Sequence, residues 1–99
     1  MLIYKILRSE EWTAFNAEGS FAGSPDDLRD GYIHLSTAEQ TAGTLAKYFA
    51  GVAELVKLTL AAEALGEALR WEQSRGGMAF PHLYRALERH DIVAVSLLA

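Results

Sequence analysis

A single domain of the α+β class is predicted by three features of the sequence. Runs with the two-residue alternation of β-strands are interspersed with segments that carry helix-capping residues and apolar side chains at helical spacing. The chain has 99 residues, near the common size for one hydrophobic core, and 51% of them are hydrophobic. Its sequence contains no internal repeat or linker. We therefore expect one domain over residues 1–99, with about five or six strands and two principal helices.

The first half of the sequence alternates between strand and helix signals. A β-rich run opens it, and an acidic first turn followed by an apolar stripe and a glycine predicts a short helix. A loop rich in glycine and turn-forming residues comes next, long enough to be a candidate lid. A second strand then leads directly into a helix whose apolar stripe should face the sheet. In order, these segments are residues 2–7, 10–18, 19–30, 32–36 and about 38–50.

The second half is predicted to be mainly strand. Residues 54–60 alternate apolar and polar side chains, and residues 61–65 make one helical turn before Gly66. Two further strands follow, over residues 67–72 and 78–83, joined by a turn at residues 74–77, and Pro81 fits an edge position in the second of them. The last run, residues 91–98, is rich in Ile, Val and Leu and is interpreted as a buried strand.

The stretch Asp-Gly-Tyr-Ile-His-Leu-Ser-Thr-Ala-Glu-Gln, residues 30–40, is the main functional signal. In an extended chain Tyr32, His34 and Ser36 point to one face, while Ile33 and Leu35 point to the core. The following helix has two overlapping capping boxes at its start, which would place first-turn amides near His34. That combination favours an anionic or strongly dipolar ligand. The two boxes are Ser36 with Glu39 and Thr37 with Gln40.

A second histidine stands in a similar setting, because Phe80, His82 and Tyr84 share one face of a predicted strand. Arg70 and Glu72 share a face of a third strand. Most single histidines are structural, yet two on polar strand faces beside a carboxylate are what acid–base work or ligand binding in a shared cleft needs. We therefore hypothesise that the three faces meet at one cleft.

Composition excludes several classes of function. A net charge of −4 has the wrong sign for a protein that neutralises nucleic-acid phosphates. The absence of cysteine removes disulfides, thiolate nucleophiles and zinc–thiolate sites. The three histidines lack close metal-ligand spacing, so no metal site is predicted, although His34, His82 and Glu72 would be the candidate set. Without an apolar run of about 20 residues or a secretory signal, we expect no membrane partner and a cytoplasmic location.

The sequence resembles the small bacterial domain-of-unknown-function family 952 in four motifs and in their order. These motifs are an opening Leu-Ile-Tyr-Lys-Ile-Leu, then Asp-Gly-Tyr-Ile-His-Leu-Ser-Thr-Ala-Glu-Gln, Leu-Arg-Trp-Glu and Phe-Pro-His-Leu-Tyr. The resemblance covers essentially the whole chain. That family looks like a remote relative of ADP-ribosyltransferases, whose split α+β core holds NAD in a cleft between strands. The resemblance therefore implies a nucleotide-shaped cleft, for NAD or a related nucleotide, and cleavage of an N-glycosidic bond through an oxocarbenium-like state.

On this resemblance, His34, Glu72 and His82 would be the catalytic residues, with Glu72 as the stabilising carboxylate. The late strand carries His82 and Tyr84 where transferases usually carry their glutamate, which favours ligand binding over turnover. Arg8, at the end of the first strand, is an alternative to Lys5 as a cation in the cleft. The residues that would bind the nucleotide are Lys5, Tyr32, Ser36, Thr37, Arg70 and Tyr84.

Two other functions stay open at this point. Paired His-x-Ser or His-x-Thr motifs hold a phosphate in two-histidine phosphoesterases, and His34-Leu35-Ser36 fits one such half, whereas His82 is followed two residues later by Tyr84. The third hypothesis is a noncatalytic module that binds a small metabolite in the same cleft.

Overall fold

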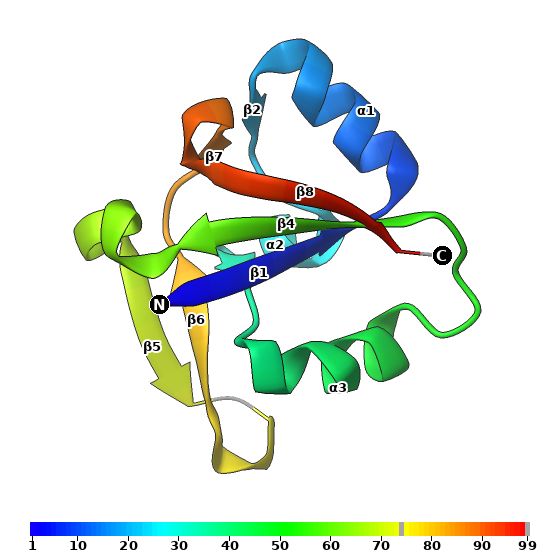
Figure 1. The fold of residues 1–99 in the computed structure, drawn as a ribbon. Helices are drawn as coiled ribbons and strands as arrows, with labels where there is room; N and C mark the ends of the chain where they lie inside the picture. Colours follow the sequence, from blue (N-terminus) through cyan, green and yellow to red (C-terminus); the bar gives the residue numbers. More distant parts are fainter. Residues whose placement is uncertain (74, 99) are drawn as a thin grey trace.

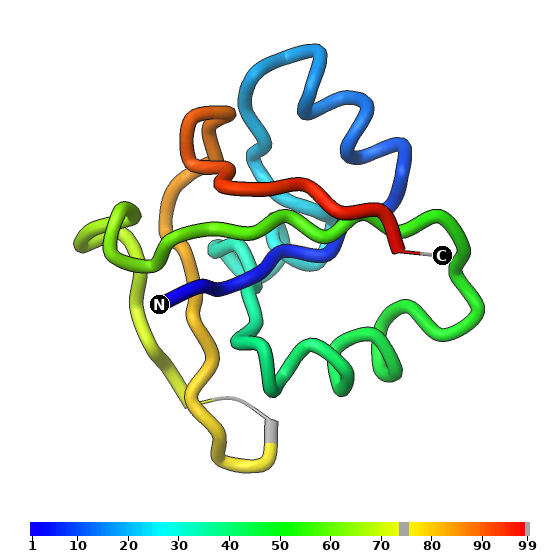
Figure 2. The backbone as a smooth tube through the Cα atoms, viewed as in Figure 1, coloured from blue at the N-terminus to red at the C-terminus, as the bar shows by residue number. Residues whose placement is uncertain are grey.

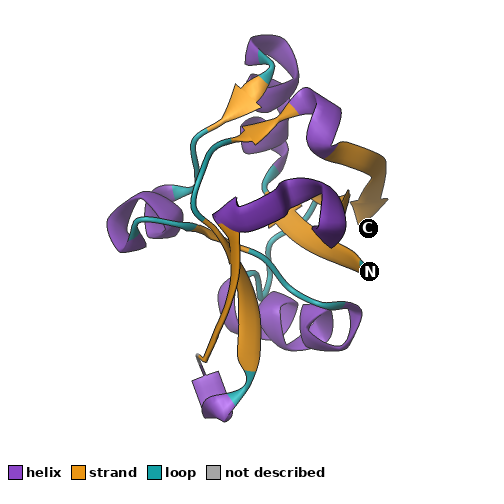
Figure 3. Ribbon diagram, turned by 90° about the vertical axis from the view of Figure 1, so that its left-hand side faces the viewer, coloured by secondary structure: helices purple, strands orange, loops and turns teal. Residues whose placement is uncertain are grey.

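The computed structural model describes residues 1–73 and 75–98 and has the predicted α+β architecture. Its strands form three small antiparallel sheets, and three α-helices and three 3₁₀ turns connect them within the described residues. Figure 3 shows the helices lying around the strands rather than in one layer. The predicted turn at residues 74–77 is a 3₁₀ turn over Arg75–Gly77, and Ser74 lies outside the described residues.

The central sheet has the strand order β1-β4-β8, and these strands run side by side in Figure 1. The predicted strands over residues 2–7 and 54–60 are confirmed as β1 (Leu2–Leu7) and β4 (Leu55–Ala61). β8 (Ile92–Leu98) completes the sheet. Because β1 and β8 are both antiparallel to β4, the two ends of the described chain lie at opposite ends of this sheet (Figure 2).

The second sheet holds the two histidine motifs, with the strand order β3-β6-β5. The third sheet pairs two short strands and closes the core beside the first helix. The strand predicted over residues 67–72 begins later, because a 3₁₀ turn occupies Ala62–Ala68. The strands of these two sheets are β3 (Ile33–His34), β5 (Leu69–Gln73) and β6 (Ala79–Leu83), and β2 (Ser20–Phe21) and β7 (Leu87–Glu88).

The strand predicted over residues 32–36 is shorter than expected because its backbone changes partner. Leu35 still donates its amide to Pro81 in β6, but Ser36 exchanges two backbone hydrogen bonds, of 2.8 and 2.9 Å, with Tyr4 in β1. The predicted alternation is confirmed for the core face, since Ile33 and Leu35 are buried. This stretch therefore joins the second sheet to the central sheet and brings His34 close to β1.

The segment predicted as a loop over residues 19–30 is mostly ordered structure. It contains β2 and a six-residue helix, α2 (Pro25–Asp30), between the predicted first helix, α1 (Ser9–Glu18), and β3. α2 begins with a capping box in which the Ser24 and Asp27 side chains bond each other's backbone amides, and Pro25 occupies its first turn. Gly31, with φ of 86°, ends the helix in the left-handed conformation. The remaining 3₁₀ turn is Arg89–Asp91.

The third helix, α3 (Ala38–Tyr48), starts at the second of the two predicted capping boxes. Thr37 accepts from the Gln40 amide, and the Gln40 side chain accepts from the Thr37 amide. Ser36 instead contacts Thr44 at 2.9 Å between hydroxyl oxygens. The predicted apolar stripe is wrong in part, because its alanines are exposed while Gln40 is buried and Thr44 half-buried. Gln40 is buried because its side chain caps α3 and donates to the Ala79 carbonyl, and Thr44 borders the cavity described below.

Thr37→Ala is expected to destabilise the protein by about 1 kcal/mol, because it removes the acceptor for an orphan amide at the start of α3. Urea unfolding followed by circular dichroism measures this change. Glu39→Ala is the matched control: Glu39 belongs to the box that does not form, so we expect less than about 0.5 kcal/mol. An equal or larger loss for Glu39→Ala would contradict this account of the helix start.

The last strand differs from its predicted environment. An uncharged run of Ile, Val and Leu favours a buried strand, but most of β8 is exposed. The physical reason is its position at the edge of the central sheet, where β4 covers only one of its sides. The core lies instead between β1, β4, α1 and the second sheet, where Ile3, Leu58 and Leu83 are fully buried.

Candidate ligand-binding site

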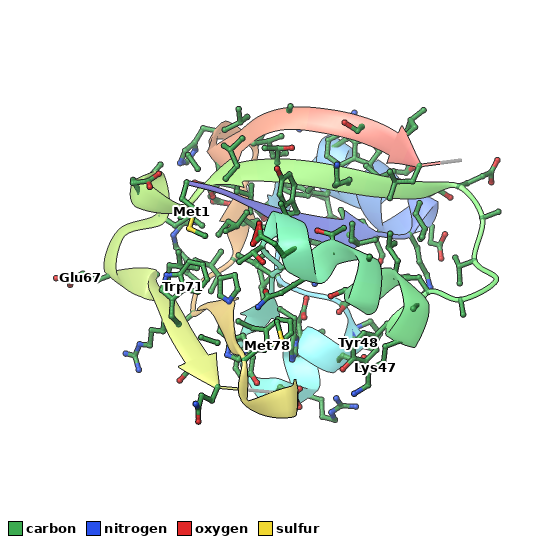
Figure 4. The ribbon with its side chains drawn as sticks, turned by 60° about the horizontal axis from the view of Figure 1, so that its bottom comes forward. Met1, Lys47, Tyr48, Glu67, Trp71 and Met78 are labelled. Carbon is green, nitrogen blue, oxygen red and sulfur yellow. The ribbon has the colours of Figure 1, made fainter. Side chains whose placement is uncertain are left out.

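A cavity of about 490 Å³ lies between β1, α2, α3 and the β3–β6 pair. Figure 4 labels Tyr48 at the end of α3, on the side where α2 lies. Helices α1 and α2 add carboxylates to the wall, from Glu10, Glu11, Asp26 and Asp27. The aromatic lining residues are Tyr4, Tyr48, Phe49 and Phe80, and the cationic ones are Lys5, Arg8 and Arg29.

The two histidines of the predicted motifs are side by side on this wall. His34 and His82 are directly opposed across the β3–β6 pair, with ring centroids 5.7 Å apart, and both line the cavity. The ring of Tyr32 stacks on His82 at 4.0 Å and packs against His34 at 4.7 Å. Antiparallel register between the two motifs therefore assembles one aromatic and imidazole cluster from residues 48 positions apart.

His82 is held by Glu72, which was predicted to share a polar strand face with Arg70. It is 3% exposed, and its Nδ1 lies 2.8 Å from Oε1 of Glu72 on β5. Tyr84 donates its hydroxyl to the same oxygen at 2.7 Å, and the Arg70 guanidinium lies 4.9 Å from the Tyr84 ring. These bonds from Tyr84 and His82 lower the pKa of Glu72, and the pKa of Tyr84 is raised by Glu72. A carboxylate on Nδ1 fixes the ring orientation of a histidine and leaves Nε2 for a ligand.

His34 is held from the opposite side by α2. Its Nδ1 lies 2.6 Å from Oδ1 of Asp27, and its Nε2 lies 3.0 Å from Oδ2 of Asp30. His34 therefore lies between two carboxylates of α2, and of these Asp27 also pairs with Lys5 and Asp30 with Arg29.

Asp27 is the buried centre of this network. One oxygen accepts from the backbone and ring of His34, and the other accepts from Lys5 at 2.9 Å and from the Ser24 amide. Burial acts to raise the pKa of Asp27, but the hydrogen bonds from His34 and the charge and hydrogen bond of Lys5 outweigh it and hold that pKa well below its ordinary value of 3.8. A buried carboxylate keeps its charge only when it is paired in this way. The segment predicted as a lid is therefore tied to the sheet through Asp27.

The structure separates the predicted site residues into two groups. Lys5, His34, Ser36 and His82 line the cavity. The other predicted residues surround these positions: Tyr32, Glu72 and Tyr84 contact His82 or one another, Arg70 lies over Tyr84, and Thr37 caps α3. The three strand faces thus meet at His82, with Glu72 bonded to this histidine from the neighbouring strand.

Sequence reasoning missed Asp27 and Asp30 as site residues, because both lie in or beside the segment interpreted as a loop. The signal was present: Ser24-Pro25-Asp26-Asp27 has a capping serine, a proline in the first turn and an aspartate three residues after the cap. That signature predicts a short helix that presents Asp27 inward. The aromatic lining residues carried no such signal, because their convergence depends on how α3 packs against β1.

Within the described residues, no three histidine, aspartate or glutamate side chains are arranged to hold a metal ion. No helix in that part of the chain is long and apolar enough to cross a membrane.

Comparisons with known proteins confirm the resemblance to family 952. The model of the family described as "Protein of unknown function (DUF952)" matches residues 6–95. A crystal structure of protein CC0527 from Caulobacter crescentus is 54% identical with a TM-score of 0.97, covering 100% of this chain and 87% of that one. A solution structure of CC0527 is 55% identical with a TM-score of 0.86, covering 96% and 82%. No curated protein matches the chain.

Proposed function

We propose that the chain, which belongs to the DUF952 family, binds a nucleotide-sized small molecule in the cavity beside His34 and His82. The observation that carries this proposal is the lining of the cavity, where aromatic side chains, cations and carboxylates meet in one space of about 490 Å³. Ligand pockets have volumes of roughly 300 to 1,000 Å³ and combine apolar walls with a few convergent polar groups.

The lining favours a ligand that has both a flat ring and an anionic group. Tyr4 and Phe49 offer aromatic surface to a base, while Arg8, whose guanidinium lies 5.1 Å from the Phe49 ring centroid, can pair with a phosphate. Glu10 on the same wall can accept from ribose hydroxyls. NAD and its fragments ADP-ribose and AMP combine these features, and NAD is also what the resemblance to ADP-ribosyltransferases implies.

The positions of the carboxylates support ligand binding without rapid turnover. Stabilising an oxocarbenium-like state needs a carboxylate free to face the ribose. Asp27 already accepts four hydrogen bonds, and Glu72 is engaged by His82 and Tyr84 outside the cavity lining. Glu72 is therefore suited to orient His82. If NAD is nevertheless cleaved, Glu72→Gln would lower turnover through His82, with ligand affinity largely kept.

A two-histidine phosphoesterase is the second candidate, and the pairing of His34 with His82 across adjacent strands favours it. Such chemistry needs one imidazole as base and the other as acid. His82 has Nε2 left for that role, whereas both ring nitrogens of His34 are engaged by α2 carboxylates. We therefore rank this activity below ligand binding.

Isothermal titration with NAD, ADP-ribose and AMP tests the proposal. Arg8→Gln is expected to weaken affinity about tenfold or more, because a charged hydrogen bond contributes about 1.5 to 3 kcal/mol. Arg70→Gln is the matched control, since Arg70 lies outside the cavity lining and should leave affinity unchanged. Failure of all three ligands to bind, or an equal loss for the two variants, would contradict the assignment.

Prolonged incubation with NAD and, separately, with 2′,3′-cyclic nucleotides distinguishes the three functions. We expect no more than slow release of nicotinamide and no opening of the cyclic phosphate. Rapid nicotinamide release would establish glycosidic cleavage, and rapid phosphate opening would favour the two-histidine phosphoesterase.

A further inference from the structure

The edge of the central sheet at β8 carries an apolar surface that the cavity does not use. Val93, Val95 and Leu97 are 58%, 44% and 80% exposed. Val95 and Leu97 pair with Leu58 and Val56 of β4, so they continue the apolar face that is buried on the neighbouring strand. Among the described residues, β8 pairs with β4 alone. Its outer side therefore leaves a row of backbone donors and acceptors without a strand partner.

The other edge of the same sheet is protected. The outer side of β1 exchanges two backbone hydrogen bonds with Ser36 at Tyr4. β8 lacks two of the devices that usually protect an edge strand, because residues 92–98 contain no charged residue and no proline, and the one register irregularity in its pairing with β4 lies at the start of the strand, between Ile92 and Ala94. An uncharged, apolar strand of seven residues is suited to pairing with another strand.

We propose that β8 pairs antiparallel with β8 of a second copy of this chain, so that a two-fold axis passes through Val95. In this register the sequence Ile-Val-Ala-Val-Ser-Leu-Leu is self-complementary: Val93 lies opposite Leu97 of the second copy, and Ala94 lies opposite Ser96. On the face of Val93, Val95 and Leu97 every pair is apolar, and on the other face the small residues Ala94 and Ser96 meet each other. Two-fold pairing of one surface with itself is the commonest arrangement of homodimers.

The composition of the strand favours a second copy over a different protein. β8 has no charged residue that could select a partner of opposite sign. When a second β8 runs antiparallel to it, the side chains that face each other are similar in size. The central sheets of the two copies would then form one continuous sheet of six strands, three from each copy. Because the contact is one strand pair with a narrow apolar strip, we expect a dimer in equilibrium with the monomer.

Sedimentation velocity over a range of protein concentrations tests the pairing. The unaltered protein is expected to shift from monomer to dimer as concentration rises. Val95→Lys places two like charges opposite each other at the axis and should raise the dissociation constant at least about tenfold. Leu2→Lys is the matched control, because Leu2 is an exposed apolar residue on the other edge strand and should leave the dimer intact.

A mixture of Val95→Lys and Val95→Asp proteins tests the register itself. Each alone should be monomeric, while the mixture should form a heterodimer, because opposite charges meet at the axis. Circular dichroism checks that each variant folds, and Leu97→Lys with Leu97→Asp replaces the pair if either does not. A protein that is monomeric at every concentration, a Val95→Lys variant that dimerises normally, or folded variants of opposite charge that do not associate would each overturn the proposal.

Discussion

Asp27→Asn is expected to destabilise the protein by about 3 to 5 kcal/mol, because it leaves the ammonium of Lys5 buried without a counter-charge. Lys5 and Asp27 are 7% and 1% exposed at their side chains, and their charged atoms are 2.9 Å apart. The same change weakens the attachment of α2 to His34. A domain of this size is stable by roughly 5 to 15 kcal/mol, so the loss should be visible as a large shift in urea midpoint.

Two variants make this prediction specific to the buried pair. Adding Lys5→Met to Asp27→Asn removes the uncompensated charge and should recover a substantial part of the lost stability. Asp26→Asn, one residue earlier in α2, breaks only an exposed contact with Arg29 and should cost no more than about 1 kcal/mol. Equal losses for Asp26→Asn and Asp27→Asn, or no recovery in the double variant, would contradict the role given to the pair.

The lowered pKa of Asp27 also gives the direction of the pH dependence. A carboxylate whose pKa is depressed in the folded state contributes stability that is fully present above its unfolded value of 3.8. That contribution is lost as pH falls below 3.8 toward the folded pKa. The unaltered protein should therefore lose stability in this acid range, and Asp27→Asn should show a flatter acid limb in urea unfolding measured at several pH values.

His82→Ala is expected to weaken binding of NAD or its fragments by about 1 to 3 kcal/mol, or roughly 5- to 150-fold. His82 is buried, stacks under Tyr32 and has Nδ1 engaged by Glu72, so a bound ligand would use Nε2. Isothermal titration measures the loss. His90→Ala is the control, because the side chain of His90 is 81% exposed and lies outside the cavity lining.

His82→Asn separates a loss of binding from a loss of structure. The asparagine amide can still donate to Glu72, whereas the group corresponding to Nε2 is gone. We expect this variant to remain nearly as stable as the unaltered protein but to bind the ligand as weakly as His82→Ala. Unchanged affinity in both variants would show that His82 does not contact the ligand.

The sequence predicted local structure better than the junctions between elements. Alternation in residues 2–7 and 54–60 sufficed to predict the two strands, although both are buried on both faces over part of their length, where Lys5, Ile6, Leu55 and Thr59 are buried as well. Alternation also predicted that His34, His82 and Glu72 lie on polar faces. Their convergence depends on the register of β3, β6 and β5, which is set by long-range pairing rather than by local sequence.

Two elements show why the remaining features were missed. α2 has only six residues, too few for an apolar stripe, so its capping box was the one usable signal. β8 has the composition of a buried strand, and composition does not reveal that a strand lies at an edge. The exposed apolar residues of β8 are the same residues that the dimer proposal would bury.

Nuclear magnetic resonance of the imidazole rings during titration with NAD, ADP-ribose and AMP tests the central claim most directly. The chain has three histidines, so the ring signals of His34 and His82 can be assigned with one variant each, with His90 as an internal reference. A ligand in the cavity should shift the signals of His34 and His82 in a saturable way and leave those of His90 in place. Ring signals that stay unchanged with all three ligands, or a shift confined to His90, would contradict the proposed binding site.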